Sequence, residues 1–189
     1  MSSADVADDF AERYPALFSE HFWEWGPITA QFRMTTEHPP AESLIKVRVV
    51  PFVGDDLVIL RMADGNWDHP GGTLEPGENY LQALDRESLE EAGARITNFT
   101  IFGAFDCVSH NPEPYRPHYP HSQFTQVIGF GDAEIISDPV SASDGEYEVI
   151  EEVDIVNLET AVQRLSGRSD GLWQAEVYQL AAELRSSQK

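Results

Sequence analysis

The stretch GGTLEPGENYLQALDRESLEEAGA, residues 71–94, carries the clearest helix signals of the chain. Asn79 is suited to cap the start of a helix, and Gln82, three residues later, completes a capping box. Gly93 is the permissive residue that commonly ends a helix. These signals predict a helix of about fourteen residues.

Three glutamates share one flank of this predicted helix. At about 100° per residue, Glu91 lies about 40° to one side of Glu87, and Glu90 lies about 60° to the other. We expect an apolar side to pack on a sheet, with the carboxylates along its edge; this side consists of Leu81, Leu84, Ser88, Leu89 and Ala92. Like charges at this spacing repel one another. The pattern leaves two interpretations open, a solvated acidic face or a site for Mg²⁺ or Mn²⁺, which prefer carboxylate oxygens.

The composition of the whole chain limits its partners. Acidic residues outnumber basic ones 33 to 12 in 189 residues, a net charge of −21, which disfavours extended nucleic acid as a partner. The length suits one compact domain with an added element at one end. No basic leader opens the sequence and no apolar run is long enough to span a membrane, so we expect a cytoplasmic protein without membrane association. Cys107, the single cysteine, is expected to be a buried small hydrophobe.

The N-terminal part of the sequence is patterned differently from the rest. Residues 1–40 are predicted to be an extension, with a helical element near residues 5–20 that is interrupted at Pro15. An aromatic-rich segment follows, which we expect to cover a core edge or to form a dimer contact; it includes Phe22, Trp23 and Trp25. A homodimer is therefore a candidate assembly.

The remaining residues, 41–189, are predicted to form the main domain. Apolar alternation, turn residues and helical periodicity indicate a β-hairpin over residues 44–62, three further strands and two closing helices. The strands are expected near residues 94–108, 121–131 and 147–156, and the helices near residues 158–165 and 172–185. Strands on both sides of the acidic helix predict an α/β fold.

The glycine, arginine and glutamate positions of residues 72–94 have a fixed spacing. From Gly72, five residues precede Glu78 and seven more precede Arg86; the remaining fixed positions are Glu87, Glu90, Glu91 and Gly93. This pattern resembles the Nudix box, usually written G-x5-E-x7-R-E-U-x-E-E-x-G-U, with U an aliphatic residue. All seven fixed positions match. Ser88 and Ala94 depart from the usual aliphatic residues, and we expect Ser88 to underfill a core contact or to bond back to the Leu84 carbonyl.

The resemblance implies a Nudix-like α/β/α sandwich with a mixed β-sheet, here with an N-terminal helical extension. It also implies hydrolysis of a nucleoside diphosphate linked to another moiety, with Mg²⁺ or Mn²⁺ as the cofactor. By position, the implied metal ligands are the Gly71 carbonyl, Glu87, Glu90 and Glu91. Arg86 completes the implied catalytic set, and Arg86 and Glu78 are implied to orient the helix and the loop before it. His69 stands where many members have an apolar residue, and we expect it to pack or to hydrogen-bond.

Residues outside the box are candidates for holding a small nucleotide-type substrate. Arg61 ends a predicted strand and could grip a phosphate, while the loop 110–121 offers Tyr115, Arg116 and Tyr119 for a base or sugar. The general base is either Glu87 or a glutamate of a later loop; the later candidates are Glu146, Glu148, Glu151 and Glu152. Candidate substrates are a nucleoside triphosphate, a nucleotide sugar, ADP-ribose and a dinucleoside polyphosphate. The alternative is a catalytically silent nucleotide-sensing module.

Overall fold

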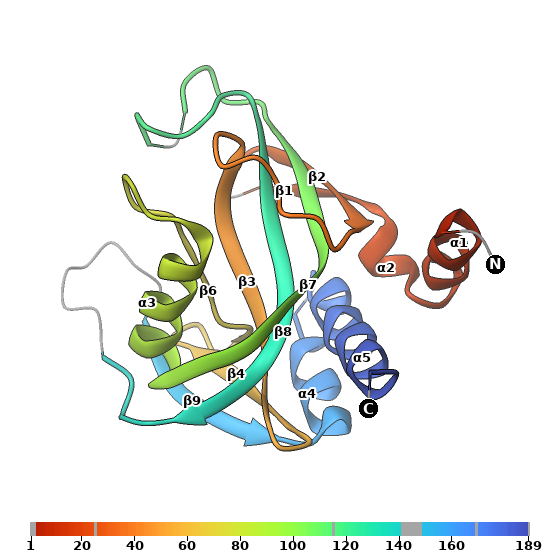
Figure 1. The fold of residues 1–189 in the computed structure, drawn as a ribbon, viewed down its shortest axis with the longest axis vertical. Coiled ribbons are helices and arrows are strands. Elements are labelled where there is room, and N and C mark those ends of the chain that lie inside the picture. Colours follow the sequence, from red (N-terminus) through yellow and green to blue (C-terminus); the bar gives the residue numbers. More distant parts are fainter. Residues whose placement is uncertain (1–2, 25, 115, 141–148, 169, 189) are drawn as a thin grey trace.

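The structure is a computed structural model that describes residues 3–24, 26–114, 116–140, 149–168 and 170–188. Side chains are described from residue 8 onward. Figure 1 shows a long, twisted sheet with helices on both sides and the N-terminal helices on the same side as α5. The chain begins with α1 (Ser3–Arg13) and α2 (Pro15–Phe18), separated at the proline that the sequence predicts to interrupt the helix.

Within the described residues, nine strands form one mixed sheet. Seven of them run in the order β1-β2-β7-β8-β3-β4-β5, while β6 pairs with β3 and β9 pairs with β4. The pairing of β3 with β8 is parallel and the other pairings are antiparallel. The strands are β1 (Glu20–Trp23), β2 (Ile28–Met34), β3 (Leu44–Val53), β4 (Asp56–Met62), β5 (Trp67–Asp68), β6 (Gly71–Thr73), β7 (Ala94–Ser109), β8 (Gln123–Ile135) and β9 (Ile150–Val156).

Helices cover the two faces of this sheet separately. One face carries α3 (Tyr80–Ala92), and the other carries α4 (Leu158–Leu165) and α5 (Leu172–Ser186) (Figure 1). Two apolar cores result, because alternate residues of β3 and β4 point to opposite faces: Val47 packs toward α3, whereas Val50 packs toward α5. The predicted α/β/α sandwich with a mixed sheet is confirmed. Among the described residues, no helix is both long and apolar enough to cross a membrane.

The N-terminal extension begins with the predicted helical element, but its aromatic-rich segment forms strands that the sequence analysis did not predict. The aromatic-rich segment forms a β1–β2 hairpin, and β2 pairs with β7 along its whole length, from Ile28 opposite Ser109 to Met34 opposite Gly103. Ala30 and Phe32 of β2 are buried while Gln31 between them is exposed, the two-residue alternation of a strand. The extension thus lengthens the sheet of the main domain. Trp25 lies outside the described residues.

Ion pairs fasten α1 to the last helix of the chain. The Arg13 guanidinium donates to both carboxylate oxygens of Glu183 at 2.9 and 2.7 Å, and the Tyr14 hydroxyl donates to the same carboxylate at 2.6 Å. Leu17, fully buried in α2, donates its backbone N–H to Glu176 at 2.7 Å. The first and last helices therefore pack as one unit on the face of the sheet opposite α3.

Candidate active site

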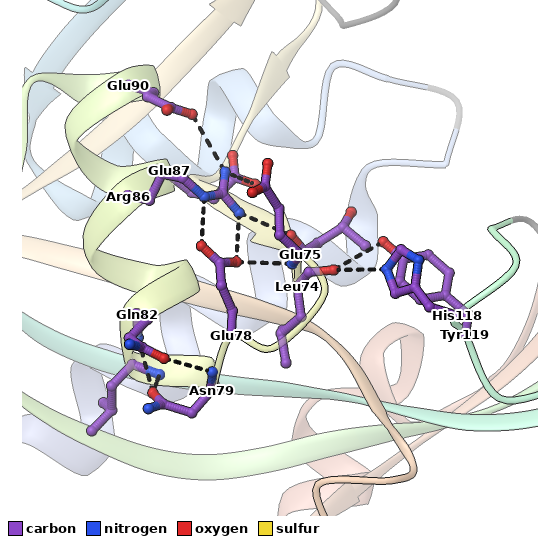
Figure 2. Close-up of polar contacts among 12 residues, drawn as sticks. Leu74, Glu75, Glu78, Asn79, Gln82, Arg86, Glu87, Glu90, His118 and Tyr119 are labelled. Atoms are coloured by element: carbon purple, nitrogen blue, oxygen red, sulfur yellow. Dashed lines mark hydrogen bonds and ion pairs between the residues drawn. The ribbon is translucent and has the colours of Figure 1, made fainter.

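The box helix begins and ends where its capping residues predict. The Asn79 side chain accepts hydrogen bonds from the backbone N–H groups of Leu81 and Gln82, and the Gln82 side chain accepts from the Asn79 N–H, so the capping box is complete (Figure 2). Gly93 takes a left-handed conformation (φ 61°) and donates to the Leu89 carbonyl. These caps fix the rotation of α3 about its own axis relative to the loop before it.

That rotation turns two of the three glutamates toward the sheet rather than along its edge. The buried residues of α3 are Ala83, Leu84, Ser88 and Ala92. Glu87 and Glu91 fall between these residues on the helical wheel, whereas Glu90 lies outside them with its side chain 49% exposed. Leu81 and Leu89, which the sequence placed on the apolar side, are 47% and 39% exposed. The predicted packing face is therefore confirmed for Leu84, Ser88 and Ala92 and wrong for Leu81 and Leu89. The observed face also includes Ala83 on the carboxylate side.

The short strand β6 offers its backbone to these glutamates. The Val49 N–H donates to the Pro70 carbonyl and the Leu74 N–H donates to the Ile45 carbonyl, which are alternate positions of the β3–β6 ladder. In an antiparallel pair the residues between such positions turn their N–H and C=O groups away from the partner strand. Gly71 is such a residue, so its N–H and its carbonyl both point out of the ladder.

Glu91 occupies the outward side of Gly71. Its Oε2 accepts a hydrogen bond from the Gly71 N–H at 2.9 Å, which crosses from the box helix to the box loop. Burial raises the pKa of the Glu91 carboxyl to about 8; the Gly71 hydrogen bond opposes this shift, and the negative charge of Glu87 adds to it. Glu91 is thus a desolvated carboxylate next to another carboxylate.

Glu87 fills the space beside Gly72. An added Cβ at Gly72 would lie 1.8 Å from the Glu87 Cδ and 1.9 Å from its Oε1, so only glycine fits against this side chain. The Glu87 side chain is 17% exposed, and its Oε1 lies 2.9 Å from Arg86 Nη1. The two glycines of the box loop therefore serve two glutamates, one by donating a hydrogen bond and the other by leaving room.

Arg86 ties the helix to the loop through a two-pronged ion pair. Its Nε and Nη2 donate to the two carboxylate oxygens of Glu78 at 2.8 and 2.9 Å, and Nη2 also donates to the Thr73 carbonyl at 3.1 Å (Figure 2). Hydrogen bonding to Glu78 raises the pKa of Arg86 above its usual value, so the guanidinium stays charged. Arg86 Nη1 lies 3.4 Å from Glu90, which completes its contacts with the box acids.

The oxygen donors of the box fit a divalent cation in type. The side chains predicted to be ligands do not point toward one common position in this structure. Across the described residues, no three His, Cys, Asp or Glu side chains are grouped closely enough to hold a metal ion as they stand. Glu91 binds the Gly71 N–H, while Glu87 and Glu90 contact Arg86. The neighbouring Glu87 and Glu91 carboxylates nevertheless repel each other, a bound cation would relieve this repulsion, and the outward Gly71 carbonyl adds a neutral oxygen.

The predicted substrate residues are placed in two regions. Arg61 lies at the end of β4 and is paired with Glu151 and Glu152 of β9, each at 3.2 Å, so these three charges already form one exposed cluster. Tyr119 is buried and its hydroxyl donates to the Leu74 carbonyl at 3.3 Å, next to the box loop. The Arg116 guanidinium lies 5.8 Å from the ring centroid of Tyr119.

The loop that carries Tyr119 therefore docks on the box loop. His118 shares the same acceptor, with its Nε2 3.5 Å from the Leu74 carbonyl oxygen (Figure 2). The structure brings this loop to the box, whereas Arg61 belongs to the β4–β9 edge. Tyr115, Glu146 and Glu148 lie outside the described residues, and their predicted roles stay predictions.

Three expectations about single residues can be compared with the structure. Cys107 is buried and burial raises the pKa of its thiol to about 12, as expected for a core residue. His69 is buried and its Nε2 hydrogen-bonds to the Arg48 guanidinium at 3.0 Å, which confirms a packing and hydrogen-bonding role. Ser88 does not bond back to the Leu84 carbonyl, because its buried hydroxyl has no hydrogen-bond partner among the described residues. The expected underfilled core contact stays a prediction.

Sequence reasoning missed the charged residues that surround His69. Arg48 and Asp68 contact His69 from either side, and Gln126 and Gln174 extend the group into β8 and α5. Arg48 lies in a strand whose other residues are mostly apolar, and a charged residue in such a run was the available signal. Only the three-dimensional pairing shows that these residues are partners.

The fold and the box together define the class of this protein. A family model described as the NUDIX domain matches residues 43–176, well over half of the chain. The chain belongs to the Nudix family. The prediction of a Nudix hydrolase is thereby confirmed at the level of the family.

Individual relatives agree with this assignment over shorter stretches. The asymmetrical bis(5'-nucleosyl)-tetraphosphatase of Mus musculus is 36% identical over 52 residues, which cover 26% of this chain and 35% of that protein. The enzyme of the same name from Sus scrofa is 34% identical over 67 residues, which cover 33% of this chain and 46% of that protein. Less than half of each relative is therefore matched.

Solved structures share the fold at low sequence identity. The Bacillus subtilis pyrophosphohydrolase BsRppH has a TM-score of 0.58 and 19% identity, and the match covers 89% of this chain and 97% of that one. A Nudix hydrolase from Nitrosomonas europaea has a TM-score of 0.50 and 17% identity, with 74% of this chain and 90% of that one covered. At such identities the likeness establishes the fold.

Proposed function

We propose that this protein is a divalent-metal-dependent pyrophosphohydrolase that cleaves a diphosphate linkage in a nucleoside diphosphate derivative. The observation that carries the proposal is the placement of Glu87 and Glu91 against the paired glycines of the box loop. Glu91 is withdrawn from solvent beside a second carboxylate, an arrangement that costs folding free energy unless a cation binds there. The cation would also screen a diphosphate from a chain of net charge −21.

Each residue of the box has a part in the proposed reaction. The Gly71 carbonyl, Glu87, Glu90 and Glu91 would hold Mg²⁺ or Mn²⁺, which supplies charge neutralisation at the phosphates and a more acidic bound water. Arg86 fixes Thr73 and Glu78 of the loop to the helix, so the two sides of the site keep one spacing. Glu87 is our first candidate for the base that takes the proton of the attacking water, because its carboxylate stays accessible beside Gly72.

A later glutamate is the second candidate for the base. Glu151 and Glu152 are exposed, but both are paired with Arg61. Replacing Glu152 by glutamine distinguishes the two possibilities: kcat falls by about 100-fold or more if Glu152 is the base, and it stays close to that of the wild type if Glu87 is the base. Glu87→Gln lowers kcat in either case, because Glu87 is also a proposed metal ligand.

The curated relatives suggest which substrates to test first. Both are asymmetrical bis(5'-nucleosyl)-tetraphosphatases, so a dinucleoside tetraphosphate heads the panel. A nucleoside triphosphate, a nucleotide sugar and ADP-ribose complete it. Purified protein is incubated with each substrate and Mg²⁺ or Mn²⁺, and the nucleotide products are separated by chromatography.

The assay includes two variants in which a single glutamate is replaced by glutamine, one as the test and one as its matched control. Glu91→Gln removes the buried carboxylate, whereas Glu159→Gln changes an exposed acid in the first turn of α4. We expect turnover of at least one substrate by the wild type and by Glu159→Gln, and a loss of about 100-fold or more in Glu91→Gln. No turnover of any substrate, combined with nucleotide binding, would instead establish the silent sensing module.

A further inference from the structure

A chain of polar groups, four of them buried, leads up to the box loop. We call it the polar ladder; its members are Gln126 of β8, Arg48 of β3, His69 and Asp68 at β5, Gln174 of α5 and Arg168. Arg48, His69, Gln126 and Gln174 are each less than 10% exposed. The proposed reaction uses none of them.

The contacts within the polar ladder fix the orientation of the imidazole. The Arg48 Nε donates to the Gln126 Oε1 at 3.0 Å, and its Nη1 donates to the His69 Nε2 at 3.0 Å. Because a guanidinium can only donate, Nε2 must accept, and the imidazole proton then sits on Nδ1. That nitrogen lies 2.9 Å from the Asp68 Oδ1, an ion-pair distance without the geometry of a hydrogen bond, and the hydrogen bond between the two residues comes instead from the His69 backbone N–H.

Asp68 is in turn held from two other parts of the chain. Its Oδ1 accepts from the Gln174 side chain at 2.8 Å and from the His69 backbone N–H at 2.8 Å, and its Oδ2 accepts from Arg168 at 3.1 Å. Burial alone would raise the pKa of Asp68, but the His69 contacts and the Arg48 charge outweigh it, so the pKa lies below its usual range. Asp68 is therefore an anion fixed by several donors.

Burying such a charged group in a core costs folding free energy. A buried ion pair rarely stabilises a fold more than apolar residues of the same volume, because both charges lose their hydration. The Arg48 Cζ lies 5.7 Å from the ring centroid of Trp23 and 5.6 Å from that of Trp173, so aromatic side chains also contact this position. What the polar ladder provides is direction, since hydrogen bonds fix angles that apolar contacts leave free.

The backbone that the polar ladder fixes leads directly into the site. Asp68 and His69 are followed by Pro70 and Gly71, and Arg48 lies opposite Gly71 in the β3–β6 register. A side chain at Gly71 would come within 2.6 Å of the Val47 carbonyl oxygen, so this peptide sits tightly on β3. The Gly71 N–H donates its hydrogen bond to Glu91 from that fixed position.

We propose that Asp68 is a positioning residue of the active site: through His69 and Arg48 it holds the Gly71 peptide in the orientation that binds Glu91 and presents the Gly71 carbonyl on the same edge. This role belongs to the site of the proposed function and rests on that function for the part played by the carbonyl. Charged neighbours that orient a ligand-bearing group typically change metal affinity by about 10- to 100-fold when removed. The expected readouts are the mobility of one peptide and the affinity for a cation.

The test compares Asp68→Asn with the wild type in two measurements. Amide hydrogen exchange of the metal-free protein, read by NMR, should show the Gly71 N–H exchanging at least about tenfold faster in Asp68→Asn. The Gly93 N–H, which donates to Leu89 at the other end of the helix, should keep its rate. Mn²⁺ affinity, measured by electron paramagnetic resonance of free Mn²⁺, should weaken by about tenfold or more.

Two further variants keep the result interpretable. Glu183→Gln removes charged bonds to Arg13 and Tyr14 far from the box, and it should change neither readout. If Asp68→Asn does not fold, Gln174→Met removes a single donor to Asp68, and it should accelerate Gly71 exchange about threefold. Equal exchange at Gly71 in folded variants, or equal acceleration at Gly71 and Gly93, overturns the proposal.

The exchange measurement also separates the positioning role from the proposed function. A wild type that hydrolyses nucleotides while Asp68→Asn keeps its Gly71 exchange rate and its Mn²⁺ affinity would refute the positioning role alone. A wild type that neither binds Mn²⁺ nor turns over any substrate would refute the proposed function, and with it the metal-binding role of the Gly71 carbonyl.

Discussion

Replacing Gly72 by alanine should disable the site without unfolding the protein. The backbone at Gly72 does not require a left-handed conformation, so alanine is allowed there. Its Cβ would nevertheless lie 1.8 Å from the Glu87 Cδ and 2.0 Å from its Cγ. Because carbon atoms settle about 3.5 Å apart, the Glu87 side chain has to retreat by about 1.5 Å or change rotamer.

The expected loss of kcat follows from the displacement of the Glu87 side chain. A displacement of about 1 Å in a catalytic group can cost about 100-fold in rate, so we expect kcat to fall by about 100-fold. Stability should change by less than about 1 kcal/mol, because the gain from restricting the unfolded chain offsets the cost of a poorer Glu87 rotamer. The assay is hydrolysis of the best substrate of the panel with Mg²⁺, accompanied by urea unfolding.

A double-mutant cycle shows whether Gly72 acts through Glu87. In a Glu87→Ala background the added Gly72→Ala change meets no carboxylate, so it should lower kcat by less than about threefold further. Gly167→Ala, a glycine exposed after α4, is the control for the substitution itself and should leave kcat unchanged. A Gly72→Ala variant that keeps kcat within about threefold of the wild type would refute the role of this close contact, as would a loss of activity that merely follows a loss of more than about 2 kcal/mol in stability.

Three further outcomes are expected. Because the folded-state pKa of Glu91 is about 8 against an ordinary 4.5, the metal-free protein should lose stability as the pH rises from about 4.5 to about 8, by on the order of 2–4 kcal/mol, whereas Glu91→Gln should not; parallel urea-unfolding curves for the two proteins would contradict this. Arg86→Lys cannot reproduce the forked contact with Glu78 and Thr73, so kcat should fall by about tenfold or more in a steady-state assay, and an unchanged kcat would show that the fork is dispensable. Cys107, buried with a thiol pKa of about 12, should react with a disulfide reagent at neutral pH only after unfolding, and rapid reaction of the native protein would place it elsewhere.

Local signals predicted the box helix well because they act between neighbours in the sequence. Asn79, Gln82 and Gly93 cap α3 through hydrogen bonds that span at most five residues, so the sequence contains both partners of each bond. The β3–β4 hairpin was predicted for the same reason, since its turn at Gly54 joins adjacent strands. The box spacing added the family and hence the sandwich architecture.

The N-terminal strands were missed although their alternation is visible. Residues of β2 gain their hydrogen bonds from β7, roughly seventy to eighty positions later, as in the pair Ile28 and Ser109. An aromatic-rich segment that covers a core edge and one that forms a strand pair have the same amino-acid composition. Only the pairing of β2 with β7 distinguishes the two interpretations. The sheet edge is a property of the assembled fold.

The sequence by itself determined the helix, its caps, the spacing of its glutamates and the need for something to offset their repulsion. Tertiary structure decided which glutamate is desolvated, because the depth of Glu91 depends on how α3 lies on β3 and β6 and on the Gly71 N–H that meets it there. It also placed Asp68 and Arg48 on either side of His69. Solvation and charge pairing depend on distance in space, whereas an amino-acid sequence gives only the separation of residues along the chain.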